Sequence, residues 1–177
     1  MKSLFCLLFV FIGFSLQQDN FYKLNGDTYT MNMFIDWEPS TTEKLMGKKS
    51  ERKIRGYDVT WTSRINMSED CSIEILEYKK CRDYSLICSE DSFIYAQSEI
   101  FASVTWGYDD VSYRTVELVG VPHRHPETGK LDILREKKWY KRGQNNLYVI
   151  SFGSTDEQTY LKWLPKIKRL INSLKEK

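Results

Sequence analysis

Residues 147–152 read Leu-Tyr-Val-Ile-Ser-Phe, an almost continuous apolar run. A strand with one face in water alternates apolar and polar residues, whereas a strand covered on both faces is apolar throughout. The run therefore predicts a strand near the centre of a sheet, buried on both faces. The turn segments at 122–129 and 142–146 are too short for parallel crossovers, so we expect the late strands to be antiparallel.

The segment after this run predicts an amphipathic C-terminal helix. Ser154 and Glu157 have the spacing of a capping box, which satisfies free N–H groups at a helix start. Apolar residues then recur at steps of three and four, namely Tyr160, Trp163, Leu164, Ile167, Leu170, Ile171 and Leu174. Pro165 removes a helical hydrogen bond, so we expect a kink or a break there. The lysines elsewhere favour a solvated face, with a surface for an anionic partner as the alternative.

Periodicity predicts further elements upstream. Strands are expected at 29–33, 56–62, 72–78, 111–121 and 131–141. Residues 63–70 are polar and suit a hairpin connection, and 42–53 are strongly charged and predict an exposed loop or short helix. A helix is expected at 89–103, capped by Ser89, with Phe93, Ala96, Ile100 and Val104 at helical spacing.

The closing strand and helix resemble those of the PsbP/Mog1-like fold. In that group a strand of the type LYVxxF leads into a helix that closes on I-x-S-(F/L)-K, as in Ile171 to Lys175 here. Residues 56–61 resemble its early strand, and 31–39 its opening strand. The resemblance implies an α+β protein with a central antiparallel β-sheet flanked by helices on both faces, an α/β/α sandwich with a C-terminal amphipathic helix.

The resemblance also implies a class of function. Photosystem members bind the oxygen-evolving complex, and Mog1 members bind a nuclear GTPase. Common to the group is non-catalytic binding, usually of other proteins, without a cofactor. We therefore expect a binding module whose partner is another protein.

The N-terminus predicts export. Lys2 precedes an uncharged apolar run that extends to Leu16, with the small residues Gly13 and Ser15 near its end. This is typical of a signal peptide, too short to span ~30 Å of hydrocarbon comfortably. We expect a signal peptide at 1–16 and one globular domain at 17–177, secreted and with no stable membrane insertion after cleavage. An uncleaved membrane anchor is the alternative.

The charge balance gives no indication of nucleic-acid binding. The chain has 26 Lys and Arg against 24 Asp and Glu, a net charge of +2. A nucleic-acid-binding surface is strongly basic, so this near-neutral balance argues against that partner. The five tryptophans are enough to build a substantial core.

The cysteines bear on the compartment. In an oxidising compartment a pair among Cys71, Cys81 and Cys88 is expected to form a disulfide. The third thiol is left over, and the sequence does not choose the pair. Asn66 begins the sequon Asn-Met-Ser, which predicts glycosylation on a surface loop if the host is a eukaryote.

One segment has residues that suit metal binding. His123 and His125 are the two histidines of the chain, and Glu127 follows them at a hairpin tip. Two imidazoles and a carboxylate can hold a metal ion, and histidine suits acid–base chemistry near neutral pH. An ordinary solvated loop is the alternative. Asp109 and Asp110 form a carboxylate pair that suits calcium or a simple turn.

Two classes of function remain open from the sequence. The first is a secreted interaction module without chemistry. The second is a small extracellular metal-dependent hydrolase that uses the His123/His125 loop. A Cys–His nucleophile has no supporting local pattern, and no GxSxG, HExxH, Walker or GxGxxG motif occurs.

Overall fold

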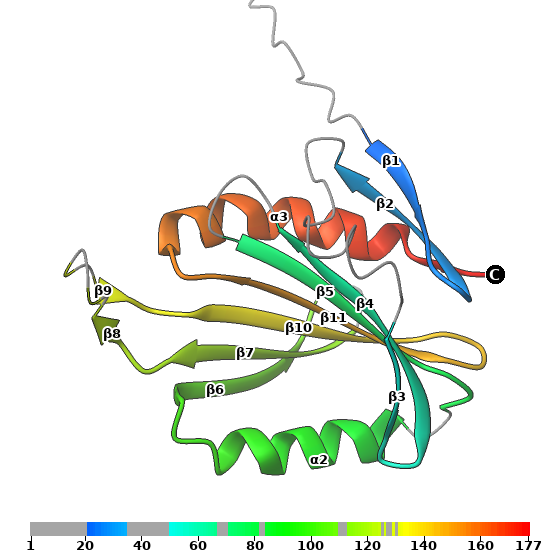
Figure 1. Cartoon of the computed structure of the whole chain (residues 1–177), viewed down its shortest axis with the longest axis horizontal. Coiled ribbons are helices and arrows are strands. Elements are labelled where there is room, and N and C mark those ends of the chain that lie inside the picture. Colours follow the sequence, from blue (N-terminus) through cyan, green and yellow to red (C-terminus); the bar gives the residue numbers. More distant parts are fainter. Residues whose placement is uncertain are drawn as a thin grey trace, which may run out of the picture.

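A computed structural model describes residues 21–34, 50–66, 71–81, 84–109, 113–124, 126, 129 and 131–177 (Figure 1). The first half contains β1 (Phe21–Asn25), β2 (Tyr29–Phe34), β3 (Ser50–Ile54), β4 (Tyr57–Asn66), β5 (Cys71–Tyr78) and α2 (Tyr84–Ala96). The second half contains β6 (Phe101–Tyr108), β7 (Arg114–Gly120), β8 (His123–Arg124), β9 (Leu131–Asp132), β10 (Arg135–Arg142), β11 (Leu147–Ser154), α3 (Glu157–Ser173) and β12 (Lys175–Glu176).

The main sheet has seven strands in the order β3-β4-β5-β11-β10-β7-β6, and every pair in it is antiparallel. Strand β11 is the fourth of the seven, with neighbours on both sides. Residues 147–152 are all buried. The structure thus confirms a mainly antiparallel α+β protein, with the continuous apolar run at the sheet centre.

One face of the sheet packs against α3. The core on this face joins alternate residues of β5 and β11, such as Ile73 and Ile150, to Trp139 of β10 and to the apolar stripe of α3. Strand β2 adds Tyr29, Met31 and Met33, all buried as their alternation predicts. The apolar stripe of α3 therefore packs against both β11 and β2, and the rest of the helix surface faces outwards.

The opposite face packs against α2. Its core joins Val59, Tyr78, Val116, Tyr140 and Val149 from the strands to Ile87 and Cys88 of α2. Because successive strand residues point to opposite faces, Val149 lies in this core and Ile150 in the other. The two helices thus belong to two different core clusters.

A small sheet of β1, β2 and β12 fastens the C-terminus beside α3. Lys175 and Glu176 pair with Thr30 and Tyr29 of β2. The Glu176 carboxylate accepts a hydrogen bond from Asn146 Nδ2 at 2.6 Å, and Lys177 N donates to the Thr28 carbonyl at 2.7 Å. These bonds join both ends of the described domain to the hairpin between β10 and β11.

Two local predictions upstream of β11 were wrong. The helix expected at 89–103 is instead α2 at 84–96 followed by strand β6, so Ser89 lies within the helix and Val104 lies in a strand. Part of the charged segment expected as a loop or short helix is strand β3, because an edge strand tolerates charges in water. The turn at 37–42 lies outside the described residues.

The start of α3 also differs from prediction. Ser154 is the last residue of β11, where pairing with Cys71 and Arg135 keeps it in the sheet. The N-cap is Asp156, whose carboxylate accepts a hydrogen bond from Thr159 N at 2.8 Å. Helix α3 runs from Glu157 to Ser173 without a break at Pro165.

Helix α3 tolerates Pro165 because the proline lies on the exposed side of the helix. Pro165 is exposed, and so is Leu161, whose carbonyl would otherwise bond to an N–H at 165. Water can therefore replace the missing donor. Neither helix among the described residues is long and apolar enough to cross a membrane.

Candidate functional site

The structure places the predicted metal residues only in part. His123 lies exposed in the two-residue strand β8, opposite Asp132 of β9. His125 and Glu127 lie outside the described residues. Among the residues that the structure does describe, no group of three His, Cys, Asp or Glu side chains could hold a metal ion. The metal site therefore stays a prediction from the sequence.

The three cysteines lie in the core on different faces of the sheet. Cys81 and Cys88 belong to the α2 core, whereas Cys71 belongs to the α3 core. No disulfide joins any two of the three. Burial raises the pKa of the Cys88 thiol to about 12, despite the opposing charge of Arg114. Cys81 and Cys88 therefore share one core cluster, and Cys71 lies in the other.

Asn66 and Asp109 have local structural positions. Asn66 is the last residue of β4 and pairs with Ser72. Asp109 closes the connection between β6 and β7, because its carboxylate accepts from Tyr113 N at 2.8 Å and its own N–H donates to the Tyr113 carbonyl at 3.0 Å. Asp110 lies outside the described residues, so the calcium interpretation is not tested, but Asp109 has a turn role.

The inner side of α2 is fixed to the sheet by a polar cluster around Asp91. Arg55, in the β3–β4 turn, contacts the Asp91 carboxylate at 2.6 Å and Glu90 at 2.8 Å. The Tyr140 hydroxyl donates to the other Asp91 oxygen at 2.7 Å. Asp91 is 9% exposed and Tyr140 1% exposed. One carboxylate thus joins three parts of the fold that are far apart in the sequence.

The pKa values of these groups follow from burial and from Asp91. Burial raises the pKa of Tyr140, and the neighbouring Tyr95 and Asp91 raise it further. Burial alone would lower the pKa of Arg55, but the hydrogen bond and charge of Asp91 raise it overall. The phenol therefore stays protonated as a donor and the guanidinium stays charged. The Tyr140 hydroxyl and the Arg55 guanidinium together hold the Asp91 carboxylate in one orientation and so attach α2 to the sheet.

Aromatic contacts fix the C-terminal half of α2 in the same way. Tyr95 packs edge-on against Phe101 and stacks on Trp106, with ring centroids 5.8 and 6.4 Å apart. Trp106 in turn lies 5.6 Å from the ring of Tyr140. Lys138 sits over Tyr95 at 5.2 Å. This cluster joins α2 to β6 and β10.

The outer side of α2 is apolar although it faces solvent. Leu86 is 44% exposed, Phe93 64% and Ile94 51%. With Ser89 and Glu90 they line a shallow hollow of about 390 Å³, bounded also by Arg55. We call Leu86, Ser89, Glu90, Phe93 and Ile94 the α2 patch. Because Arg55 is engaged by Glu90 and Asp91, the patch offers mainly apolar contact.

The sequence interpretation missed this surface. It placed Phe93 and Ile100 at helical spacing in one helix, whereas Phe93 is 64% exposed and Ile100 lies beyond the end of α2 and is 66% exposed. A signal was present: apolar residues lie all around α2, so the helix carries a second apolar side beyond the one that packs. Exposed apolar side chains that line one hollow make this side of α2 the candidate interaction surface.

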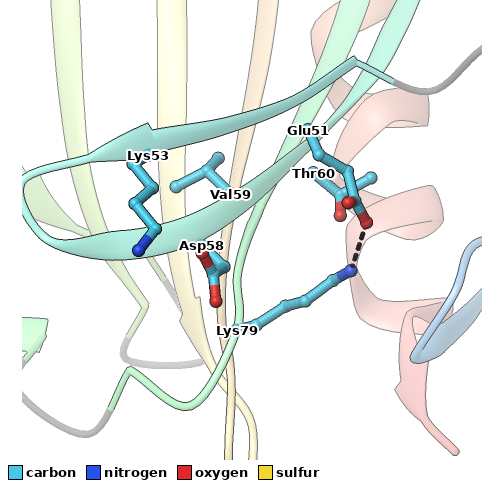
Figure 2. A pocket seen from close by; sticks show the side chains of 6 residues that line it. All are labelled: Glu51, Lys53, Asp58, Val59, Thr60 and Lys79. Carbon is cyan, nitrogen blue, oxygen red and sulfur yellow. Dashed lines mark hydrogen bonds and ion pairs between the residues drawn. The ribbon is translucent and has the colours of Figure 1, made fainter.

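A second hollow lies where the β3–β4 hairpin meets the end of β5 (Figure 2). It has about 140 Å³, and Figure 2 shows Lys79 extending to Glu51 beside Thr60, with Lys53 and Asp58 near the hairpin turn. Lys79 Nζ lies 2.9 Å from Glu51, and this bond raises the pKa of Lys79. Thr60 is fully buried, and its hydroxyl has no hydrogen-bond partner among the described residues.

The size of this second hollow limits what it can hold. Ligand pockets occupy roughly 300–1,000 Å³, whereas one water molecule takes up about 30 Å³. The hollow therefore suits a few waters or one inserted side chain. A water bonded to the Thr60 hydroxyl would satisfy that group, so the hollow gives no indication of a substrate site.

The fold and these surfaces define an α+β protein with an open apolar patch on a firmly held helix. No family model matches the chain, and no curated protein matches it. Among solved structures it is similar to the Ran-binding protein Mog1p of Saccharomyces cerevisiae, with 10% identity over 89% of this chain and 95% of that one and a TM-score of 0.44. The match agrees with the predicted resemblance to the PsbP/Mog1-like group.

Proposed function

We propose that this chain is a secreted, non-catalytic protein-binding module that binds its partner through the α2 patch. The observation that carries the proposal is the exposure of Phe93 and Ile94 on the outer side of a helix whose inner side is locked by Asp91. A flexible apolar helix would lose entropy on binding, whereas a rigid one presents its anchors at little further cost.

The charge around α2 indicates the chemistry of the partner. From Tyr84 to Ile100 the chain has three carboxylates, Glu90, Asp91 and Glu99, and no Lys or Arg. Arg55 at the edge of the hollow pairs with Glu90 and Asp91, so three carboxylates against this one guanidinium leave the surroundings of the patch net negative. An apolar surface with an acidic rim fits a helix whose apolar side chains are flanked by Lys or Arg. We propose such a helix of another protein as the occupant.

A selection of displayed helical peptides tests the proposal. Ligands enriched on the protein should carry an apolar stripe flanked by basic residues. They should lose binding to a Phe93→Ser/Ile94→Ser variant and keep it to Leu161→Ser. Leu161 is the matched control, because it is an apolar residue of α3 with 57% exposure. If no ligand is enriched, or if the α2 variant binds as well as the control, the proposal is wrong.

The proposal includes the predicted architecture and compartment. The two core clusters on opposite sheet faces support the three-layer α/β/α sandwich of PsbP/Mog1-like type. Secretion rests on the apolar N-terminal run, and it implies oxidation of a cysteine pair. We propose Cys81–Cys88 as that pair, because both lie in the α2 core. Secretion of the mature chain from a host cell, with a Cys81–Cys88 bond and a Cys71 thiol in non-reducing peptide mapping, would support this. Retention in the cytosol, or a bond to Cys71, would contradict it.

A further inference from the structure

Strand β6 is the last strand of the seven-stranded sheet, and within the described residues no strand pairs with its outer edge (Figure 1). Its other edge pairs with β7 from Phe101↔Gly120 to Tyr108↔Arg114. Within the described part of the chain, β7 is the only segment whose backbone hydrogen-bonds to that of β6. An open edge presents N–H and C=O groups that can pair with another strand.

The two edge strands of the sheet differ in how well their sequences prevent pairing with another chain. Strand β3, at the opposite edge, contains Glu51, Arg52 and Lys53 within five residues. Charges of this kind keep edge strands from pairing with other chains. Strand β6 reads Phe-Ala-Ser-Val-Thr-Trp-Gly-Tyr and has neither a charge nor a proline. Its irregularity lies between Phe101 and Ser103, so the stretch from Ser103 onwards pairs regularly with β7.

We propose that β6 pairs antiparallel with β6 of a second copy of this chain, so that two seven-stranded sheets join into one across a two-fold axis. A two-fold axis sets each residue of the strand against another residue of the same strand. Any charge in β6 would meet a like charge or lie close to one, which destabilises a cross-strand pair. The absence of charge over the whole strand is therefore what self-pairing requires.

The exposed apolar residues at the two ends of β6 support the same occupant. Ile100 precedes the strand and is 66% exposed, and Tyr108 ends it and is 68% exposed. In the register centred on Val104, Ile100 of one copy lies opposite Tyr108 of the other. Both ends would be covered at once, and Ser103 would lie opposite Thr105.

Two charge variants test this register. Ser103 and Thr105 are both exposed, so substitution there leaves the core intact. In protein produced from the full-length sequence, we expect a dimer by light scattering or sedimentation. The Ser103→Lys/Thr105→Lys variant and the Ser103→Glu/Thr105→Glu variant should each be monomeric, because like charges meet twice across the axis. A mixture of the two should form a heterodimer, and Lys53→Glu on the other edge should leave the wild-type dimer unchanged.

A measurement without substitution keeps the proposal testable if a variant fails to fold. Hydrogen exchange of the β6 amides should slow as protein concentration rises, while exchange in β3 stays constant. A wild-type protein that is monomeric at high micromolar concentration would overturn the proposal. So would a dimer that persists in both charge variants, or β6 exchange that is independent of concentration. Pairing through β6 uses backbone groups and not the α2 patch, so this inference and the proposed function can fail separately.

Discussion

Replacing Tyr140 by Phe tests the attachment of α2 to the sheet. The hydroxyl donates to the Asp91 carboxylate at 2.7 Å, and both residues are buried. The substitution removes one hydrogen bond to a charged acceptor and changes no apolar contact of the ring. Such bonds contribute about 1.5–3 kcal/mol, and the lost donor leaves one oxygen of Asp91 without this partner. A domain of this size loses about 2–4 °C in Tm per kcal/mol, so we expect Tm to fall by about 3–12 °C.

The assays are thermal unfolding for Tm and urea unfolding for the free energy of unfolding, both followed by tryptophan fluorescence, with Tyr160→Phe as the matched control. Tyr160 is also buried, at 6% exposure, and stacks on Phe152 in the other core. Within the described residues its hydroxyl makes no hydrogen bond, so its loss should change the free energy of unfolding by less than about 0.5 kcal/mol. If Tyr140→Phe costs no more than Tyr160→Phe, the reasoning about the Asp91 cluster is refuted.

A double-mutant cycle separates this bond from other effects of the ring. Asp91→Asn removes the charge that both Tyr140 and Arg55 contact. Groups in one hydrogen-bonded cluster show interaction energies of about 0.5–3 kcal/mol. We therefore expect Tyr140→Phe to cost clearly less in the Asp91→Asn background than in the wild type. Additive effects would mean that the hydroxyl and the carboxylate do not act together.

Further predictions concern pH, helix α3 and metal binding. Burial raises the pKa of Tyr78 to about 12, so the folded state holds this proton more tightly than the unfolded state. The difference contributes about 2–3 kcal/mol to the free energy of unfolding, present below pH ~10 and lost as the pH rises towards ~12. In Tyr78→Phe this part of the alkaline loss of stability should be absent, as measured by unfolding at alkaline pH. Pro165→Ala should raise the free energy of unfolding by about 1–3 kcal/mol, because it restores a helical N–H, and an unchanged or lower value would contradict this. Purified mature protein should contain no stoichiometric metal; metal that is lost in His123→Ala/His125→Ala would favour the extracellular hydrolase instead.

The elements that the sequence predicts correctly are those whose apolar residues follow one clear pattern. Residues 147–152 are apolar on both sides, and the stripe of α3 repeats at steps of three and four, so each pattern fits one environment. Helix α2 has apolar residues all round and therefore gives no clear phase. The end of α2 was predicted too late because Ile100 and Val104 continue the helical spacing of Phe93 and Ala96 by chance. Residues 101–108 form a strand because they pair with β7 in the folded chain.

The candidate site depends on contacts that no local pattern contains. Arg55 and Asp91 are 36 residues apart, and Asp91 and Tyr140 are 49 apart. Their meeting follows from strand order, which sets the β3–β4 turn and β10 beside α2. Exposure of Phe93 follows from the same placement, since the inner side of α2 is chosen by Ile87, Cys88 and Asp91. The sequence could indicate an apolar helix, but not which side of it faces solvent.

The most direct test of the central claim is the affinity of a selected basic, amphipathic helix for the wild type and for single variants. Anchors at the centre of a protein interface contribute at least about 2 kcal/mol, which corresponds to roughly a 30-fold change in Kd. We predict that Phe93→Ser raises the Kd by at least about this factor, while Leu161→Ser on α3 leaves it within about twofold. Equal effects of the two substitutions, or none from Phe93→Ser, would contradict binding through the α2 patch.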